Sequence, residues 1–204
     1  EQRIARALTR LADDKLSVAF VAEFSRGKSE LINALFFADY GQRILPSAAG
    51  RTTMCPTELL YDPALPPSLR LLPIETRAAN LSTSDYRDDA AAWTVLPLAL
   101  DAGAQMTETF KQVSLTKFVT PAEAKRYGLY DEDDPDAAST LDAHGMVEVS
   151  LWRHAIINFP HPLLKQGLVI LDTPGLNAIG TEPELTLNLI PNAHAVLFIL
   201  AAET

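Results

Sequence analysis

The chain has 204 residues, of which 48% are hydrophobic and 21% are charged, so it can bury a sizeable core and is neither a disordered tail nor a disulfide-stapled miniprotein. Its 17 basic and 26 acidic residues give a net charge of −9, which argues against nucleic acid as the main partner, because nucleic-acid phosphates require clustered Lys and Arg. The single cysteine, Cys55, excludes an internal disulfide and a cysteine-based zinc site and fits a reducing compartment, so we expect a cytoplasmic protein.

The first 14 residues have apolar positions at helical spacing between charged ones, and this pattern predicts a helix that leads into the domain. Beyond it, short apolar runs that are typical of buried strands alternate with segments of helical periodicity. The strands are predicted at residues 16–21, 168–171 and 195–200, and the helices at residues 28–37 and 181–190. This alternation predicts the α/β class, with a mostly parallel sheet flanked by helices. The longest apolar run, residues 195–202, is too short to span a bilayer.

The middle of the chain has a different pattern, because prolines interrupt it and short helical patches stand between loops. One patch carries the signals of a complete helix, which are an N-cap, a proline at the first helical position, a capping-box acid and a terminating glycine, at Thr120, Pro121, Glu123 and Gly128. We predict that the chain consists of a leading helix, a domain and a large insertion within that domain, at residues 1–14, 15–204 and about 76–145.

Residues 22–29, with the sequence AEFSRGKS, match the phosphate-binding pattern G-x-x-x-x-G-K-[ST] except that alanine replaces the first glycine. A loop between a strand and a helix turns successive backbone N–H groups toward one point, and the helix N-terminus adds a partial positive charge, so fixed dipoles hold the phosphates. Lys28 is expected to reach the β and γ phosphates, and the Ser29 hydroxyl to bind Mg²⁺. An ordinary helix N-terminus is the structural alternative. The predicted nucleotide-binding residues are Ala22, Glu23, Phe24, Ser25, Arg26, Gly27, Lys28, Ser29 and Glu30.

A nucleotide hydrolase also needs a group that senses Mg²⁺ and the γ phosphate, and residues 168–175 supply candidates. Asp172 ends a predicted buried strand, where parallel sheets bind ligands, and is expected to hold a Mg²⁺-bound water. Gly175 is expected to present its N–H to the γ phosphate. Thr53, in the loop after the first predicted helix, is expected to complete the Mg²⁺ shell and orient the attacking water. The alternatives are a Pro-Gly turn that begins with Asp172 and an ordinary threonine-rich loop.

Three segments, in this order, resemble the GTPase domain of the dynamin superfamily in its bacterial dynamin-like branch: Ser25 to Ser29, Arg51 to Thr53 and Asp172 to Leu176. Residues 159–167 are also similar to the bacterial members. The resemblance implies a P-loop NTPase fold similar to a G domain, and the predicted insertion then lies between the threonine loop and the Asp172 strand. It also implies Mg²⁺-dependent binding and hydrolysis of GTP, with a monovalent cation, K⁺ or Na⁺, and with the catalytic residues Ser25, Lys28 and Thr53.

The same resemblance implies a homodimer that forms through the nucleotide face of the GTPase domain and drives membrane remodelling or partner assembly. Membrane contact is then made by parts outside this chain, so the expected location is cytoplasmic and peripheral to the membrane. Leu176 stands where small signalling GTPases carry a water-orienting glutamine, so another group must position the water. The candidates are Asn177, the backbone near Thr53 and the cation near Ser25, and an internal arginine finger is open to Arg26 or Arg51.

Dynamins read guanine with a Thr/Asn-Lys-x-Asp motif soon after the strand that corresponds to residues 195–200, and this sequence stops at Thr204 before such a motif. We therefore expect an incomplete GTPase domain, in which the choice of GTP over ATP rests on resemblance alone. Two alternatives stay open. One is a P-loop ATPase of another family, and the other, motivated by Ala22, is a nucleotide-binding scaffold with vestigial hydrolysis.

Three further signals are assigned structural roles. The acidic cluster at residues 131–136 lacks the spacing of a Ca²⁺ loop and is expected to be a solvated loop. The four histidines lack close metal-ligand spacing and are expected to serve in strands or loops. Cys55 has no obvious activating base and is expected to pack in the core.

Overall fold

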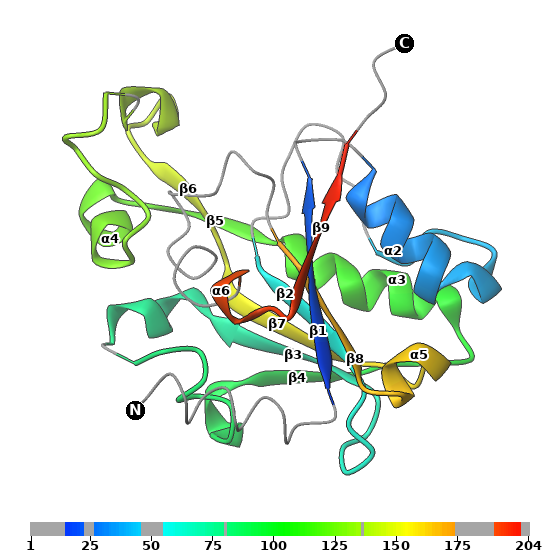
Figure 1. Cartoon of the computed structure of the whole chain (residues 1–204). Helices are drawn as coiled ribbons and strands as arrows, with labels where there is room; N and C mark the ends of the chain where they lie inside the picture. The colour runs from blue at the N-terminus through cyan, green and yellow to red at the C-terminus, as the bar shows by residue number, and fades with distance from the viewer. Residues whose placement is uncertain are drawn as a thin grey trace.

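The computed structural model describes residues 15–22, 27–45, 55–79, 81–135, 137–173 and 190–200. Its centre is a seven-stranded sheet with the order β4-β3-β7-β2-β8-β1-β9 (Figure 1). The strands are β1 (Leu16–Ala22), β2 (Thr57–Leu60), β3 (Ser68–Pro73), β4 (Thr94–Pro97), β7 (Trp152–Asn158), β8 (Leu168–Asp172) and β9 (Ala195–Ile199). The helix predicted at residues 1–14 lies outside the described residues, and so do residues 181–189 of the later predicted helix.

The three strands predicted from apolar runs lie side by side at one end of the sheet. β1 pairs in parallel with β8 on one side and with β9 on the other. This arrangement confirms the predicted α/β class with parallel strands flanked by helices. The other four strands come from the part of the chain between the two predicted strand–helix units. Among them, β2 runs parallel to β7, while β2 with β8, β3 with β7, and β3 with β4 form antiparallel pairs.

Helices pack on one face of the sheet and enclose the main hydrophobic core (Figure 1). They are α2 (Lys28–Phe36), α3 (Gly103–Lys111) and the short α5 (Pro162–Lys165), and the residues that they bury there include Ile32, Phe36, Met106, Phe110 and Leu164. Strand β8 contributes side chains to both faces of the sheet, because successive side chains of a strand point to opposite faces. Its Ile170 joins the main core, whereas Val169 and Leu171 join a smaller core on the opposite face. None of the described helices is long and apolar enough to cross a membrane.

Strand β9 departs from the sequence prediction in its burial. Its position agrees with the predicted strand, but we expected it to be buried, and Val196, Leu197 and Phe198 are 38%, 42% and 60% exposed. The physical reason is its place at the edge of the described sheet, where β1 is its one paired neighbour. A short apolar run looks the same in sequence whether the strand becomes central or lies at an edge.

The segment predicted to be an insertion, at about residues 76–145, contributes to two places. Strand β4 and helix α3 belong to the large sheet and its main core. Strand β5 (Thr116–Val119) instead pairs antiparallel with β6 (Val147–Ser150) in a separate two-stranded sheet. This small sheet and α4 (Pro121–Arg126) lie away from α2 and α5 in Figure 1, with an apolar cluster of their own.

The predicted capping box of α4 is confirmed. The Thr120 hydroxyl accepts a hydrogen bond from the Glu123 backbone N–H at 3.3 Å, and the Glu123 carboxylate accepts one from the Thr120 N–H at 3.1 Å. Pro121 occupies the first turn, where its missing N–H costs nothing. Gly128 follows the helix with a φ of +69°, the left-handed conformation expected of a terminating glycine.

Candidate functional site

The proposed phosphate loop leaves the sheet at the carboxyl end of β1. In the parallel ladder, Phe20 of β1 is the partner of Asp172 of β8, so β1 and β8 end at the same edge of the sheet. Ala22, which replaces the first glycine of the motif, is 1% exposed and is the partner of Ile199 in β9. The two halves of the predicted site therefore lie together, as expected for ligand binding at the carboxyl ends of parallel strands.

Gly27 begins helix α2 in a left-handed conformation, with a φ of +84°. Among the described residues, a Cβ placed on this residue would meet nothing within 4 Å, so the backbone conformation is the reason that favours glycine there. No described side chain forms a capping hydrogen bond at this end of α2. The first backbone N–H groups of a helix have no partner within the helix and can bind an anion, which fits the predicted phosphate cradle.

Lys28 and Asp172 are in direct contact. The Lys28 ammonium donates hydrogen bonds to the Asp172 carboxylate and to the Thr173 backbone carbonyl. The side chains of Lys28 and Asp172 are each 10% exposed, so the pair is largely shielded from solvent. The predicted phosphate-binding lysine and the predicted magnesium ligand therefore occupy one site, although 144 residues separate them in sequence.

The two other described candidates follow Lys28 in the first turn of α2. Ser29 is half-buried and directly follows Lys28 in the sequence. Together with the Asp172 carboxylate it would supply oxygen ligands, which Mg²⁺ prefers, so these two residues fit the predicted metal. Glu30 instead forms an ion pair with Arg43, with the Arg43 Nε 3.1 Å from its carboxylate.

Several predicted site residues lie outside the part of the chain that the structure describes. They are Glu23, Phe24, Ser25, Arg26, Thr53 and Gly175, together with Arg51, Leu176 and Asn177. The roles given to them above stay predictions. In the described residues, no group of three or more His, Cys, Asp or Glu side chains could hold a metal ion.

Strand β2 enters the sheet beside this site. Thr57, its first residue, is the antiparallel partner of Asp172. Cys55 precedes it, is fully buried in the main core and agrees with the predicted packing role. Burial raises the pKa of the Cys55 thiol, and the charge of Asp172 acts in the same direction, so the sulfur stays protonated and unreactive at neutral pH.

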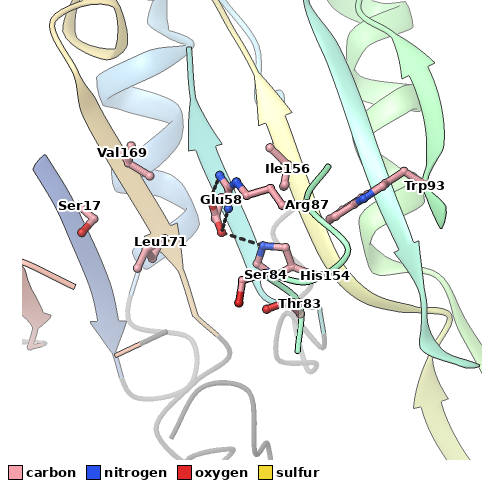
Figure 2. Close-up of a pocket in the computed structure, with 10 residues that line it drawn as sticks. All are labelled: Ser17, Glu58, Thr83, Ser84, Arg87, Trp93, His154, Ile156, Val169 and Leu171. Carbon is pink, nitrogen blue, oxygen red and sulfur yellow. Dashed lines mark hydrogen bonds and ion pairs between the residues drawn. The ribbon is translucent and has the colours of Figure 1, made fainter. Parts of the chain in front are cut away.

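On the opposite face of the sheet, β2 carries a buried charge that the sequence analysis missed. Glu58 is 7% exposed, and its carboxylate accepts hydrogen bonds from both terminal nitrogens of Arg87, at 3.1 and 2.8 Å. The Nε2 of His154, on β7, lies 3.0 Å from the same carboxylate. Figure 2 shows both side chains directed at Glu58. The signal in the sequence was a single acid next to the apolar pair Leu59 and Leu60 in a short strand, because a buried acid needs a charged or hydrogen-bonding partner.

The three residues line a cavity of about 220 Å³ on this face (Figure 2). Burial alone would raise the pKa of Glu58, but the hydrogen bonds and charges of His154 and Arg87 outweigh it and hold the pKa well below its usual range. The carboxylate is therefore ionised at neutral pH. His154 is in a strand, as predicted for the histidines.

Other arginines on the same face hold the connection between β3 and β4 against the sheet. Arg153 donates to the carbonyls of Thr76 and Leu81 at 3.0 and 2.9 Å. Arg70 donates to the Arg87 carbonyl at 3.0 Å and lies over the Trp93 ring. These arginines bind the protein's own carbonyl and carboxylate oxygens. The arginine-rich face is therefore not evidence of a nucleic-acid surface, in agreement with the negative net charge of the chain.

The remaining signals have structural roles. His161 caps α5 by accepting a hydrogen bond from the Leu163 N–H at 3.3 Å, and Ser17 of β1 contacts His194 at 2.7 Å. In the acidic cluster, Glu132 forms an ion pair with Lys125 on the surface, and Asp136 lies outside the described residues. The predictions of structural histidines and of a solvated acidic loop agree with these contacts.

Comparisons with known proteins agree with the motifs. A model of the Dynamin family matches residues 18–204. A protein of Nostoc punctiforme named "Bacterial dynamin-like protein" is 27% identical over 183 residues, which cover 90% of this chain and 20% of that relative. The chain thus spans about one fifth of the relative's length.

Two solved structures, both described as an oligomerised bacterial dynamin pair that provides a mechanism for the long-range sensing and tethering of membranes, also match this chain. They are 20% and 18% identical, each with a TM-score of 0.43, and the match covers 94% and 96% of this chain and 22% of each of theirs. The match of the family model covers most of the sequence and includes both halves of the site around Lys28 and Asp172. The chain belongs to the dynamin family.

Proposed function

We propose that this chain is the phosphate- and magnesium-binding part of a GTPase that hydrolyses GTP by in-line attack of water on the γ phosphate. The observation that carries the proposal is the contact between Lys28, at the start of α2, and Asp172, at the end of β8. A lysine and a carboxylate at the carboxyl ends of adjacent parallel strands are the two groups that a P-loop site needs for phosphate and for metal.

The described residues suggest how the site would act. The backbone N–H groups that follow Gly27 would bind phosphate oxygens, and Lys28 would leave Asp172 to neutralise the β and γ phosphates. Ser29 and Asp172, with Thr53, would hold Mg²⁺, which when bound supplies charge neutralisation on the phosphates. Because the helix already fixes the backbone N–H groups at the start of α2, little reorganisation of these donors is needed when charge develops in the transition state.

The remaining roles follow from the family resemblance. Ser25 would place a monovalent cation, Thr53 would orient the attacking water with its backbone, and Gly175 would sense the γ phosphate through its N–H. Homodimerisation through the nucleotide face would stimulate hydrolysis. Membrane remodelling or partner assembly would then involve parts of a longer protein, peripheral to the membrane and in the cytoplasm, because the chain spans one fifth of its named relative.

Nucleotide titration of the full-length protein tests this function. We expect Mg²⁺·GTP to bind more tightly than Mg²⁺·ATP, and Lys28→Ala to weaken GTP binding by roughly 100-fold, because a buried charge-assisted contact is lost. Tighter binding of ATP would favour a P-loop ATPase of another family and contradict the GTPase proposal.

The second candidate is a nucleotide-binding scaffold without useful hydrolysis. The observation in its favour is Ala22, whose methyl is packed at the end of β1 where the motif has glycine. Measured turnover separates the two candidates. If wild-type protein turns over GTP no faster than Lys28→Ala and Ser25→Ala, the scaffold is correct and the GTPase is not.

A further inference from the structure

Thr173 occupies a position that neither the motif nor the catalytic roles above explain. It directly follows β8 and has no solvent exposure. Its hydroxyl donates a hydrogen bond to the backbone carbonyl of Phe20 in β1 at 2.8 Å. The ladder between the two strands ends one residue earlier, at the pair of Phe20 and Asp172, so this hydroxyl extends the attachment of β8 to β1 beyond the ladder.

The backbone of the same residue faces the predicted phosphate lysine. The Lys28 ammonium contacts two oxygens from consecutive residues, the carboxylate of Asp172 and the carbonyl of Thr173. A lysine side chain has many rotamers, so two fixed acceptors are needed to hold it in one place. The first acceptor, Asp172, is already held by ladders with β1 and β2 on its two sides. Thr173 lies one residue beyond both ladders, and its hydroxyl restrains the carbonyl that is the second acceptor.

We propose that Thr173 is a positioning residue, which holds Lys28 against its two oxygen acceptors by tying the end of β8 to β1. Thr173 acts through its own carbonyl, which accepts from Lys28, while its side chain is hydrogen-bonded to β1. The proposal rests on the proposed function in taking Lys28 as the phosphate-binding lysine. It adds that phosphate binding is an exchange, in which Lys28 leaves two protein oxygens for phosphate oxygens.

The test is the reactivity of Lys28 in the full-length, nucleotide-free protein. An amine-reactive ester is added, and mass spectrometry of the peptides gives the acylation rate of Lys28 relative to that of Lys111, an exposed lysine on α3. In wild type, Lys28 should react far more slowly than Lys111, because it is buried and paired. Thr173→Val removes the hydroxyl with little change of shape, and we expect it to raise the Lys28 rate roughly tenfold, as the loss of one hydrogen bond would.

Two variants distinguish a positioning role of the Thr173 hydroxyl from a general disturbance of the fold. Thr173→Ser keeps a hydroxyl that reaches the Phe20 carbonyl, so the Lys28 rate should return to that of wild type. Thr140→Val removes a hydroxyl that donates to the Ala137 carbonyl at 2.7 Å, far along the chain, and should leave Lys28 unchanged. Should Thr173→Val fail to fold by circular dichroism, Thr173→Ala replaces it in the same comparison. Equal Lys28 rates in wild type and in the hydroxyl-free variant at position 173 would overturn the proposal.

A second measurement keeps this inference separate from the GTPase proposal. Mg²⁺·GTP is added to wild type and to Thr173→Ser, and its binding is measured directly. If neither binds GTP but the Lys28 rates differ as described, the positioning role stands and the proposed function fails. If both bind GTP but the acylation rate of Lys28 is the same in wild type and in Thr173→Val, the function stands and Thr173 does not position Lys28.

Discussion

Lys28 and Asp172 form a buried ion pair between the first turn of α2 and the last residue of β8. Each charge is removed from water, so each depends on the other for compensation. The pair also joins a helix to a strand from the other end of the chain. It is therefore both part of the candidate site and a contact between two elements of the fold.

A double-mutant cycle measures that dependence. Lys28→Met and Asp172→Asn should each lower the free energy of unfolding in urea, because each leaves a partner without compensation. The double variant should be less destabilised than the sum of the two, with a coupling of about 1–3 kcal/mol. Strict additivity of the single effects would mean that the two charges do not interact in the folded protein.

Glu58 should make stability fall in acid. Its pKa in the folded protein lies below its usual range, whereas in the unfolded chain it is about 4.3, so the unfolded state binds the proton first. Its stabilising contribution is thus complete above roughly pH 5 and is lost as the pH falls through about 4 and below. Glu58→Gln should be less stable than wild type at pH 7, by about 1–3 kcal/mol.

The measurement is the urea midpoint of both proteins between pH 7 and pH 3. The difference between wild type and Glu58→Gln should shrink as the pH falls, since protonation removes the charge that the variant lacks. His154 and Arg87, which face Glu58, are present in both proteins, so the difference reports their contacts with the charged carboxylate. A gap that stays constant over this range would show that Glu58 is not held ionised.

Gly27→Ala, compared with Gly41→Ala, should distinguish the stability cost of a strained backbone conformation from an effect on phosphate binding. The left-handed conformation at a φ of +84° costs an alanine about 1 kcal/mol of stability. Gly41, with a φ of +62° and equally open space around it, is a matched control in which the same substitution has the same kind of cost. Only Gly27→Ala should also weaken nucleotide binding, measured by titration, because Gly27 belongs to the proposed phosphate loop. Equal nucleotide affinity in the two variants would place the phosphates elsewhere.

Thr120→Ala should destabilise α4 without affecting the nucleotide site. Loss of the N-cap hydroxyl removes one half of the capping box and should cost about 1 kcal/mol. Hydrogen exchange should increase in the small sheet of β5 and β6 and in α4, while nucleotide affinity stays at the wild-type value. Thr120→Ser, which keeps the capping hydroxyl, should exchange like wild type.

The sequence was informative where the signals are local. The capping box at Thr120 and Glu123 involves residues three apart, and the strand that ends at Asp172 is an apolar run with a polar residue after it, so both were predictable. The order of strand, loop and helix around Gly27 and Lys28 was predictable for the same reason.

What the sequence did not reveal depends on pairing between distant segments. The network of Glu58, Arg87 and His154 arises because β2 lies between β7 and β8, and no local pattern specifies that neighbour. The exposure of β9 likewise depends on which strands flank it. The contact of Lys28 with Asp172 brings two predicted site residues together, but their pairing required the register of β1 and β8.

The strand order bears on when the site can assemble during synthesis. Strand β1 is made early, yet its two neighbours in the described sheet, β8 and β9, are made near the other end of this sequence. Contacts between segments so far apart form slowly, because closing a long loop costs conformational entropy before the contacts can stabilise the fold. A growing chain on the ribosome therefore carries its phosphate loop with no opposing carboxylate for most of the synthesis of this segment. Competence to bind nucleotide should appear abruptly, once β8 has emerged and joined β1.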